Sequence, residues 1–137
     1  MSAAPDAWPK RTGKTGRGTA TLPAGGPTTM DAWELDDVDA TRQAAGRAYH
    51  EFVSVPDLSG GLYVLEAGAT APQSPHTEDE LYVVMSGRAR VTVGGDERDV
   101  RPGSIVFVGA GVPHKFHDIE ERLVLVVAFG PAEDSRS

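Results

Sequence analysis

The sequence contains no cysteine, which excludes disulfide bonds and thiolate metal ligands. A metal ion would have to be held by imidazole, carboxylate, amide, hydroxyl or water. No run approaches the 18 consecutive apolar residues that indicate a membrane-spanning helix. The N-terminus also lacks the apolar segment of a secretory signal, so we expect a cytoplasmic protein.

Positive charge is scarce as well. The chain has 13 Lys and Arg residues against 20 Asp and Glu residues, which gives a net charge of −7. This balance argues against non-specific binding to nucleic acid or to an anionic membrane. A length of 137 residues suits one domain with a core of its own. We therefore expect a single domain with no nucleic-acid or membrane partner.

Residues 1–29 differ from the rest of the chain, because they are rich in Gly, Pro, Thr, Ala and Ser and lack apolar periodicity. Their charge is +4 − 1 = +3, which leaves −7 − 3 = −10 for the remainder; the charged residues are Lys10, Arg11, Lys14, Arg17 and Asp6. This composition predicts a disordered basic tail on an acidic domain. The tail docks on an acidic surface, or it is a disordered leader, or Met1 is an upstream start codon and Met30 is the true start.

The rest of the chain lacks strongly periodic helices. Residues 30–46 are acidic and predict an irregular segment with one helical turn, and residues 132–137 predict a polar tail. Between them, Gly- and Pro-rich turns, including Ser59–Gly61 and Ser86–Gly87, separate short apolar runs. The strands expected are 47–55, 62–66, 80–85, 88–93, 97–100, 104–108, 114–117 and 123–129. Short strands at such spacing indicate an all-β sandwich or barrel over residues 47–131.

The alternating run that begins at Glu80 carries the first candidate site residue. Alternate residues of a strand share a face, so Glu80 lies on the same side as Tyr82 and Val84. A carboxylate on the buried face of an apolar strand is costly unless it is paired or bound to metal. If the opposite face is buried instead, Glu80 points to solvent, and alternation alone leaves both arrangements open.

Histidines supply the other candidates. His76 precedes the strand of Glu80, and His114 follows the Gly- and Pro-containing loop at 109–113. Imidazole and carboxylate together suit a divalent transition metal. His117 points away from the face of His114, and His50 has no ligand partner at strand spacing, so we expect neither of them to bind metal.

Two stretches of this sequence resemble the two motifs of the cupin family. The first motif reads Gly, five residues, His, one residue, His, three or four residues, Glu, six residues, Gly. Laid on this sequence from Gly68, the two His, the Glu and the closing Gly fall on Ser74, His76, Glu80 and Gly87. The spacing fits throughout, but Ser74 stands where the family has a histidine.

The second motif reads Gly, five residues, Pro, one residue, Gly, two residues, His, three residues, Asn. Laid on this sequence from Gly103, these positions fall on Gly109, Gly111, His114 and Asp118. The spacing again fits, while Gly109 and Asp118 depart in identity. The resemblance covers about residues 61–130.

The resemblance implies a double-stranded β-helix, or jelly-roll barrel, with a metal site inside. Its ligands here would be His76, Glu80 and His114, and the ion would be Fe(II), Mn(II), Zn(II) or Ni(II). The place of the missing histidine at Ser74 would be taken by water, Gln73 or Glu78, with Ser74 able to hydrogen-bond a metal-bound water.

The function implied is that of a small metal-dependent enzyme, dioxygenase-like or lyase/isomerase-like, that acts on an organic acid or other oxygen-bearing molecule. Glu80 and Tyr82 are the candidate catalytic residues, and Tyr63 is a further candidate for a substrate contact. The alternative is a small-molecule-binding cupin without catalysis, acting as a sensor or accessory protein, with the metal as an anchor or absent. Cupins are commonly dimers, so we expect a homodimer formed through a sheet edge at residues 47–55.

Overall fold

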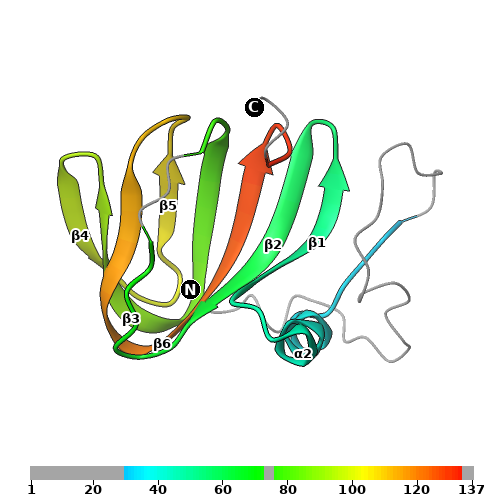
Figure 1. Cartoon of the computed structure of the whole chain (residues 1–137), viewed down its shortest axis with the longest axis horizontal. Helices are drawn as coiled ribbons and strands as arrows, with labels where there is room; N and C mark the ends of the chain where they lie inside the picture. The colour runs from blue at the N-terminus through cyan, green and yellow to red at the C-terminus, as the bar shows by residue number, and fades with distance from the viewer. Residues whose placement is uncertain (1–29, 73–75, 134–137) are drawn as a thin grey trace.

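The structure is a computed structural model that describes residues 30–72 and 76–133. Three predictions therefore concern residues outside the described part: the basic tail at 1–29, and the ligand roles of Gln73 and Ser74. One helix and six strands are assigned within the described residues (Figure 1). In chain order they are α2 (Leu35–Ala45), β1 (Tyr49–Val55), β2 (Leu58–Leu65), β3 (Asp79–Val93), β4 (Asp96–Val100), β5 (Ile105–Val108) and β6 (His114–Gly130).

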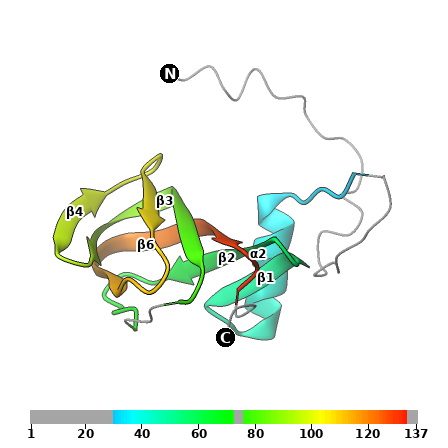
Figure 2. The same cartoon turned by 90° about the horizontal axis from the view of Figure 1, so that it is seen from above.

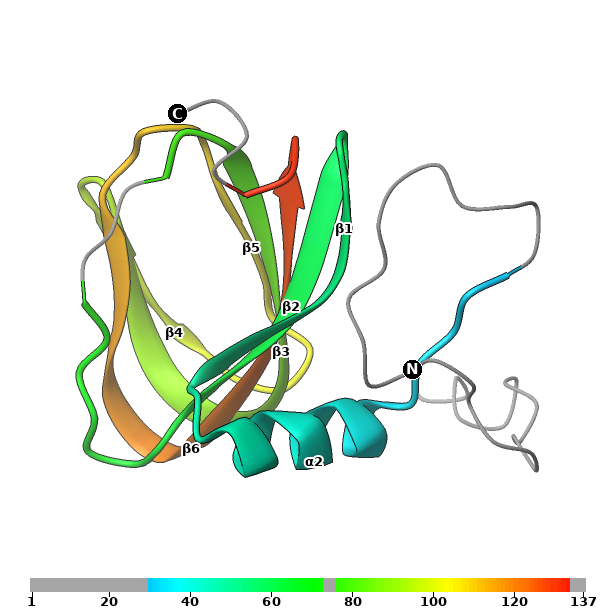
Figure 3. The ribbon, with the colours of Figure 1, turned by 45° about the vertical axis from the view of Figure 1, so that its right-hand side comes forward.

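All strand pairs are antiparallel, in the order β1-β2-β6-β3-β4, with β5 paired to β3. The long strands β3 and β6 run side by side and bend together, so the sheet curls around an interior (Figure 3). Three register shifts lie in β3 between Val84 and Arg90, and such bulges increase local bending. Gly87 sits among them with φ of 96°, and a Cβ there would overlap the carbonyl of Arg122. The all-β prediction is confirmed.

The interior holds the main core, to which β3 and β6 contribute alternate residues. Its buried members include Tyr82, Val84, Ala89, Val91, Phe116, Leu123, Leu125, Val127 and Phe129. The alternation of buried and exposed positions along both strands produces this arrangement, because successive side chains point to opposite faces.

Helix α2 corrects the prediction of an irregular segment at residues 30–46. It lies outside the curled sheet, against β1 and β2 (Figure 2). Its one fully buried apolar side chain, Val38, packs in a second cluster with Leu62 and Val64. Gly46 ends the helix in the left-handed conformation at φ of 69°. The helix depends on this contact with the sheet, which a short acidic sequence with little apolar periodicity does not reveal.

Three turn predictions are also wrong. The chain turns at residues 56–57, and Ser59–Gly61 lies within β2. Within the strand, position 61 suits glycine, because a Cβ there would overlap the ring of Tyr49. The breaks expected at 86–87 and 118–122 are irregularities within the continuous strands β3 and β6.

None of the helices in the described part of the chain has the length and apolar character needed to cross a membrane.

Candidate metal centre

Strand β3 places Glu80 inside the curled sheet. Glu80 is 1 % exposed and Tyr82 is 4 % exposed, whereas Leu81 between them is 42 % exposed. The arrangement in which Glu80 faces solvent is therefore excluded. A buried carboxylate needs hydrogen bonds or a cation to offset the loss of hydration.

His114 begins β6 and lies across from Val93 of β3. Its ring is 5 % exposed, and its Nδ1 lies 2.9 Å from the carbonyl oxygen of Val112. A carbonyl can only accept, so Nδ1 carries the proton and donates. The other nitrogen, Nε2, then faces Glu80, with 3.3 Å to Glu80 Oε1.

His76 lies in the loop before β3, and its side chain is 22 % exposed. The backbone N–H of Gly111 donates to the carbonyl of His76 over 2.6 Å, which joins the loops of the two sequence motifs. The His76 ring packs edge-on against Phe129, with 5.0 Å between ring centroids. Its Nε2 lies 3.9 Å from Glu80 Oε2.

The three side chains converge on one point, because one ligand atom from each of His76, Glu80 and His114 lies within 4.8 Å of the other two. Two atoms bound to one ion at about 2.1 Å lie up to about 4 Å apart, so the measured 3.3 and 3.9 Å suit a shared ion. Glu80 Oε2 is buried and has no hydrogen-bond partner among the described residues. This orphaned oxygen, turned toward His76, fits a metal ligand.

Comparison with known proteins agrees with the motifs. The cupin domain family profile matches residues 61–129, which is 129 − 61 + 1 = 69 of 137 residues. The chain belongs to the cupin family.

Relatives of this cupin establish the fold and leave the activity open. An uncharacterized protein of Streptomyces coelicolor is 49% identical over 104 residues, which cover 76% of this chain and 99% of that protein. An RmlC-like cupin of Shewanella frigidimarina superposes with a TM-score of 0.59 at 20% identity, over 65% of this chain and 79% of that one. A protein of Bacillus halodurans gives a TM-score of 0.64 at 18% identity, over 80% and 86%. The predicted double-stranded β-helix is thus confirmed.

Tyr82 fixes the carboxylate of this cupin's site. Its hydroxyl donates to Glu80 Oε1 over 2.5 Å and lies 3.1 Å from His114 Nε2. Burial, followed by the hydrogen bond to Glu80 and the charge of Glu80, raises the pKa of Tyr82 far above its usual value. Tyr82 therefore keeps its proton and remains a donor.

The pKa of His114 is shifted in the opposite direction from that of an ordinary buried histidine. Burial lowers its pKa, but hydrogen bonding with Glu80 and Val112 and the charge of Glu80 outweigh burial. The net pKa of His114 lies above the usual histidine value. A proton and a metal ion consequently compete for the same Nε2 atom.

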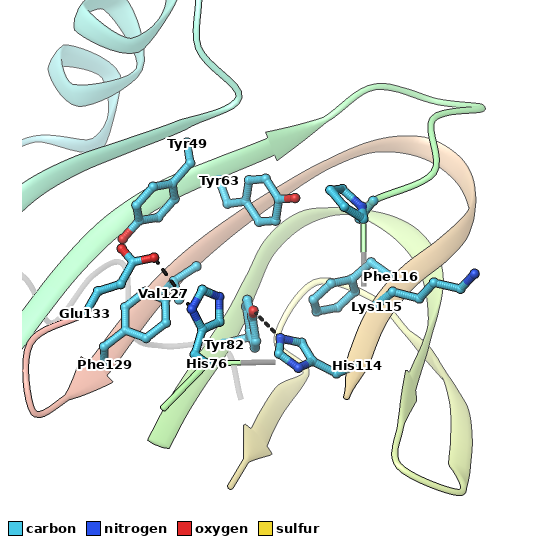
Figure 4. Close-up of a pocket in the computed structure, with 12 residues that line it drawn as sticks. Tyr49, Tyr63, His76, Tyr82, His114, Lys115, Phe116, Val127, Phe129 and Glu133 are labelled. Carbon is cyan, nitrogen blue, oxygen red and sulfur yellow. Dashed lines mark hydrogen bonds and ion pairs between the residues drawn. The ribbon is translucent and has the colours of Figure 1, made fainter. Parts of the chain in front are cut away.

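A cavity of about 180 Å³ is lined by two of the three candidate ligands, His76 and His114 (Figure 4). An apolar cavity of about 150 Å³ can hold benzene, so this space suits a molecule of roughly one-ring size. The Tyr49 hydroxyl is buried without a hydrogen-bond partner among the described residues, and burial is the main cause that raises the pKa of Tyr49. Five of the twelve lining residues are Tyr or Phe, namely Tyr49, Tyr63, Tyr82, Phe116 and Phe129; the others are His76, His114, Glu133, Ala71, Pro72, Lys115 and Val127.

The remaining candidate residues differ in where they lie. Glu78 is fully buried, but it does not join the converging ligand atoms, and its Oε2 accepts a hydrogen bond from Thr77. Tyr63 lines the cavity, and His50 does not. Sequence reasoning missed Glu133, which lines the cavity from the segment predicted to be a polar tail. No motif spacing reaches Glu133, so only the fold could reveal it.

Proposed function

We propose that this cupin binds one divalent transition-metal ion through His76, Glu80 and His114 and is an enzyme. Its substrate would be a small organic acid or other oxygen-bearing molecule held in the aromatic cavity. The reaction would be dioxygenase-like with Fe(II), or lyase- or isomerase-like with Mn(II), Zn(II) or Ni(II). Support comes from the convergence of three ligand atoms and from a cavity of one-ring size that is lined by two of the three residues, His76 and His114.

The buried oxygen Glu80 Oε2 is the observation that carries the proposal. A carboxylate that is 1 % exposed, with one oxygen lacking a hydrogen-bond partner in the described chain, is unfavourable without a cation. A protonated His114 is one such cation, and a metal ion held by His76 as well is a stronger one. The cavity beside these residues supplies room for a molecule to reach the ion.

The proposed reaction would need an ion, residues that hold it and residues that contact the substrate. A bound ion with three protein ligands supplies open coordination positions at which an oxygen function is polarised or dioxygen binds. Glu80 and the two histidines hold the ion, and the aromatic walls orient the substrate and exclude water. Tyr82 borders the cavity, so we assign it the role of proton donor or substrate contact.

The alternative is a binding cupin without catalysis, in which the same cavity holds a ligand and the ion only anchors it. The two functions share every residue of the site, so turnover must separate them. A stable complex with a small acid but no product, for all four metals, would establish the binding function and contradict the enzyme.

The experiment begins with metal content. The purified chain is loaded separately with Fe(II), Mn(II), Zn(II) or Ni(II), freed of excess ion by gel filtration, and analysed for metal per chain. We expect one ion in the wild type and none in His114→Ala, while His117→Ala serves as the control and keeps its ion. Each loaded form is then screened with small organic acids, for oxygen consumption with Fe(II) and for product formation by NMR with the others. Equal metal content in the wild type and His114→Ala would overturn the site.

A further inference from the structure

His76 has a carboxylate near each of its two ring nitrogens. Nε2 lies 3.9 Å from Glu80 Oε2. Nδ1 lies 3.7 Å from Glu133 Oε2 (Figure 4). Both partners of the second contact are largely buried, with side-chain exposures of 22% for His76 and 23% for Glu133. Among the three proposed ligands, His76 alone comes from a loop, because Glu80 and His114 belong to strands.

Glu133 reaches this position because the segment after β6 is tied to the hairpin of β1 and β2. The backbone N–H of Glu133 donates to Ser59 Oγ over 2.9 Å, and Ser59 is fully buried. One residue earlier, the N–H of Ala132 donates to the carbonyl of Pro56 over 3.2 Å. Two hydrogen bonds therefore fix the backbone that carries the carboxylate to the mouth of the cavity.

The two histidines now match in one respect. His114 directs Nδ1 to the carbonyl of Val112, which leaves Nε2 for the site, and His76 directs Nδ1 to Glu133. An acceptor at Nδ1 holds the proton on that nitrogen and keeps the Nε2 lone pair free for a metal ion. At 3.7 Å the carboxylate attracts the ring of His76 without yet forming a hydrogen bond.

We infer that Glu133 is a positioning residue for the metal site: it turns His76 toward the ion and adds a second negative charge beside it. The inference rests on the proposed function, since it requires an ion at His76, Glu80 and His114. It assigns a role in metal binding to a C-terminal segment that lies beyond both cupin motifs. Metal binding would draw Nδ1–H of His76 into a hydrogen bond with Glu133.

The test compares metal affinity in the full-length chain and its variants. Glu133→Ala removes the acceptor and the charge, while Glu133→Gln keeps an acceptor oxygen and removes only the charge. Glu120→Gln, on the exposed surface, is the control for net charge. Zn(II) affinity is measured by competition with a chromogenic chelator, and the visible spectrum of the Co(II) form reports the geometry around the ion. Thermal unfolding of the chelator-treated proteins checks that each variant folds.

We expect Glu133→Ala to lower Zn(II) affinity about 10- to 100-fold and to alter the Co(II) spectrum. Glu133→Gln should lose less, and Glu120→Gln should match the wild type. Ser59→Ala, which frees the backbone of Glu133, should give a smaller loss in the same direction. If the wild type binds Zn(II) while Glu133→Ala keeps its affinity within threefold and its spectrum unchanged, Glu133 has no such role and the metal site stands. If the wild type binds no metal, the proposed function fails, and this inference with it.

Discussion

Within the described residues of this cupin, two groups of histidine and carboxylate side chains have ligand atoms within 4.8 Å of one another, and the groups differ in burial and in hydrogen bonding. The inner group is His76, Glu80 and His114, and the outer group is Glu97, His117 and Asp118. In the outer group both ring nitrogens of His117 already have partners, Thr92 at 2.8 Å and Asp118 at 3.2 Å, and both carboxylates are exposed. The inner group is buried except for His76 and has an oxygen without a partner.

This comparison shows that residue type and spacing do not by themselves define a metal site. Water and neighbouring side chains satisfy the outer group, so an ion would gain little there. In the inner group burial has removed water, so the proposed cation would contribute more there. The predictions below test that difference, from the largest effect to the smallest.

Replacing a carboxylate should lower metal affinity in the inner group and leave it unchanged in the outer group. Glu80→Gln removes the negative charge from the buried point of convergence, and we expect metal affinity to fall more than 100-fold, to the level of the buffer control. Glu97→Gln should leave affinity unchanged, because Glu97 is 46% exposed and pairs with Arg90 at 2.8 Å. Metal per chain after dialysis against a weak chelator gives the comparison, and loss of metal in Glu97→Gln instead would reverse our choice of group.

The hydroxyl partners of the two groups should differ in their effect on folding. Tyr82→Phe removes the buried donor to Glu80 and should lower the free energy of unfolding by about 1–3 kcal/mol, because a buried charged acceptor loses its hydrogen bond. Thr92→Val removes the contact with the half-buried His117 and should cost less than about 1 kcal/mol. Urea unfolding of chelator-treated protein measures both; equal losses would mean that burial of the inner group has little energetic weight.

The pH dependence should follow His114. Its pKa in the folded chain is raised, so its contribution to stability is fully present below the unfolded value of about 6.5 and is lost as pH rises through the higher folded value. Metal affinity should move in the opposite direction and rise over the same range, since the ion replaces the proton. Unfolding and Zn(II) titrations at several pH values test this in the wild type and in His114→Gln. A pH dependence that survives unchanged in His114→Gln would contradict the assignment.

The smallest effect on the metal site should come from the outer face of the same strands. The homodimer expected through residues 47–55 stays a prediction, but the largest apolar side chains exposed in the sheet lie on β3 and β5 instead. Phe107 is 62% exposed and pairs with Leu81, and Ile105 is 65% exposed. Each would bury roughly 100 Å² more in a contact, so these residues could form the centre of an interface between two copies. Light scattering of Phe107→Glu should show a monomer with unchanged metal content, and a wild type that is already a monomer would refute the dimer.

The sequence could predict the parts of this protein that depend on local pattern. Gly and Pro turns with alternating apolar runs indicated the strands, and the spacing from Gly68 to Glu80 indicated the loop that carries His76. The pattern failed where a distant contact decides the local structure. Helix α2 forms against Leu62 and Val64 of β2. Gly61 lies within β2 instead of in a turn, where the absence of a Cβ leaves space for the ring of Tyr49. Glu133 reaches the site only through hydrogen bonds with a hairpin more than 70 residues earlier in the chain.

A crystal structure of the Zn(II)-loaded chain, with the ion located by anomalous scattering, tests the central claim most directly. We predict one ion with bonds of about 2.0–2.2 Å to His76 Nε2, Glu80 and His114 Nε2. An ion at Glu97, His117 and Asp118, or no ion within bonding distance of Glu80, would contradict the claim.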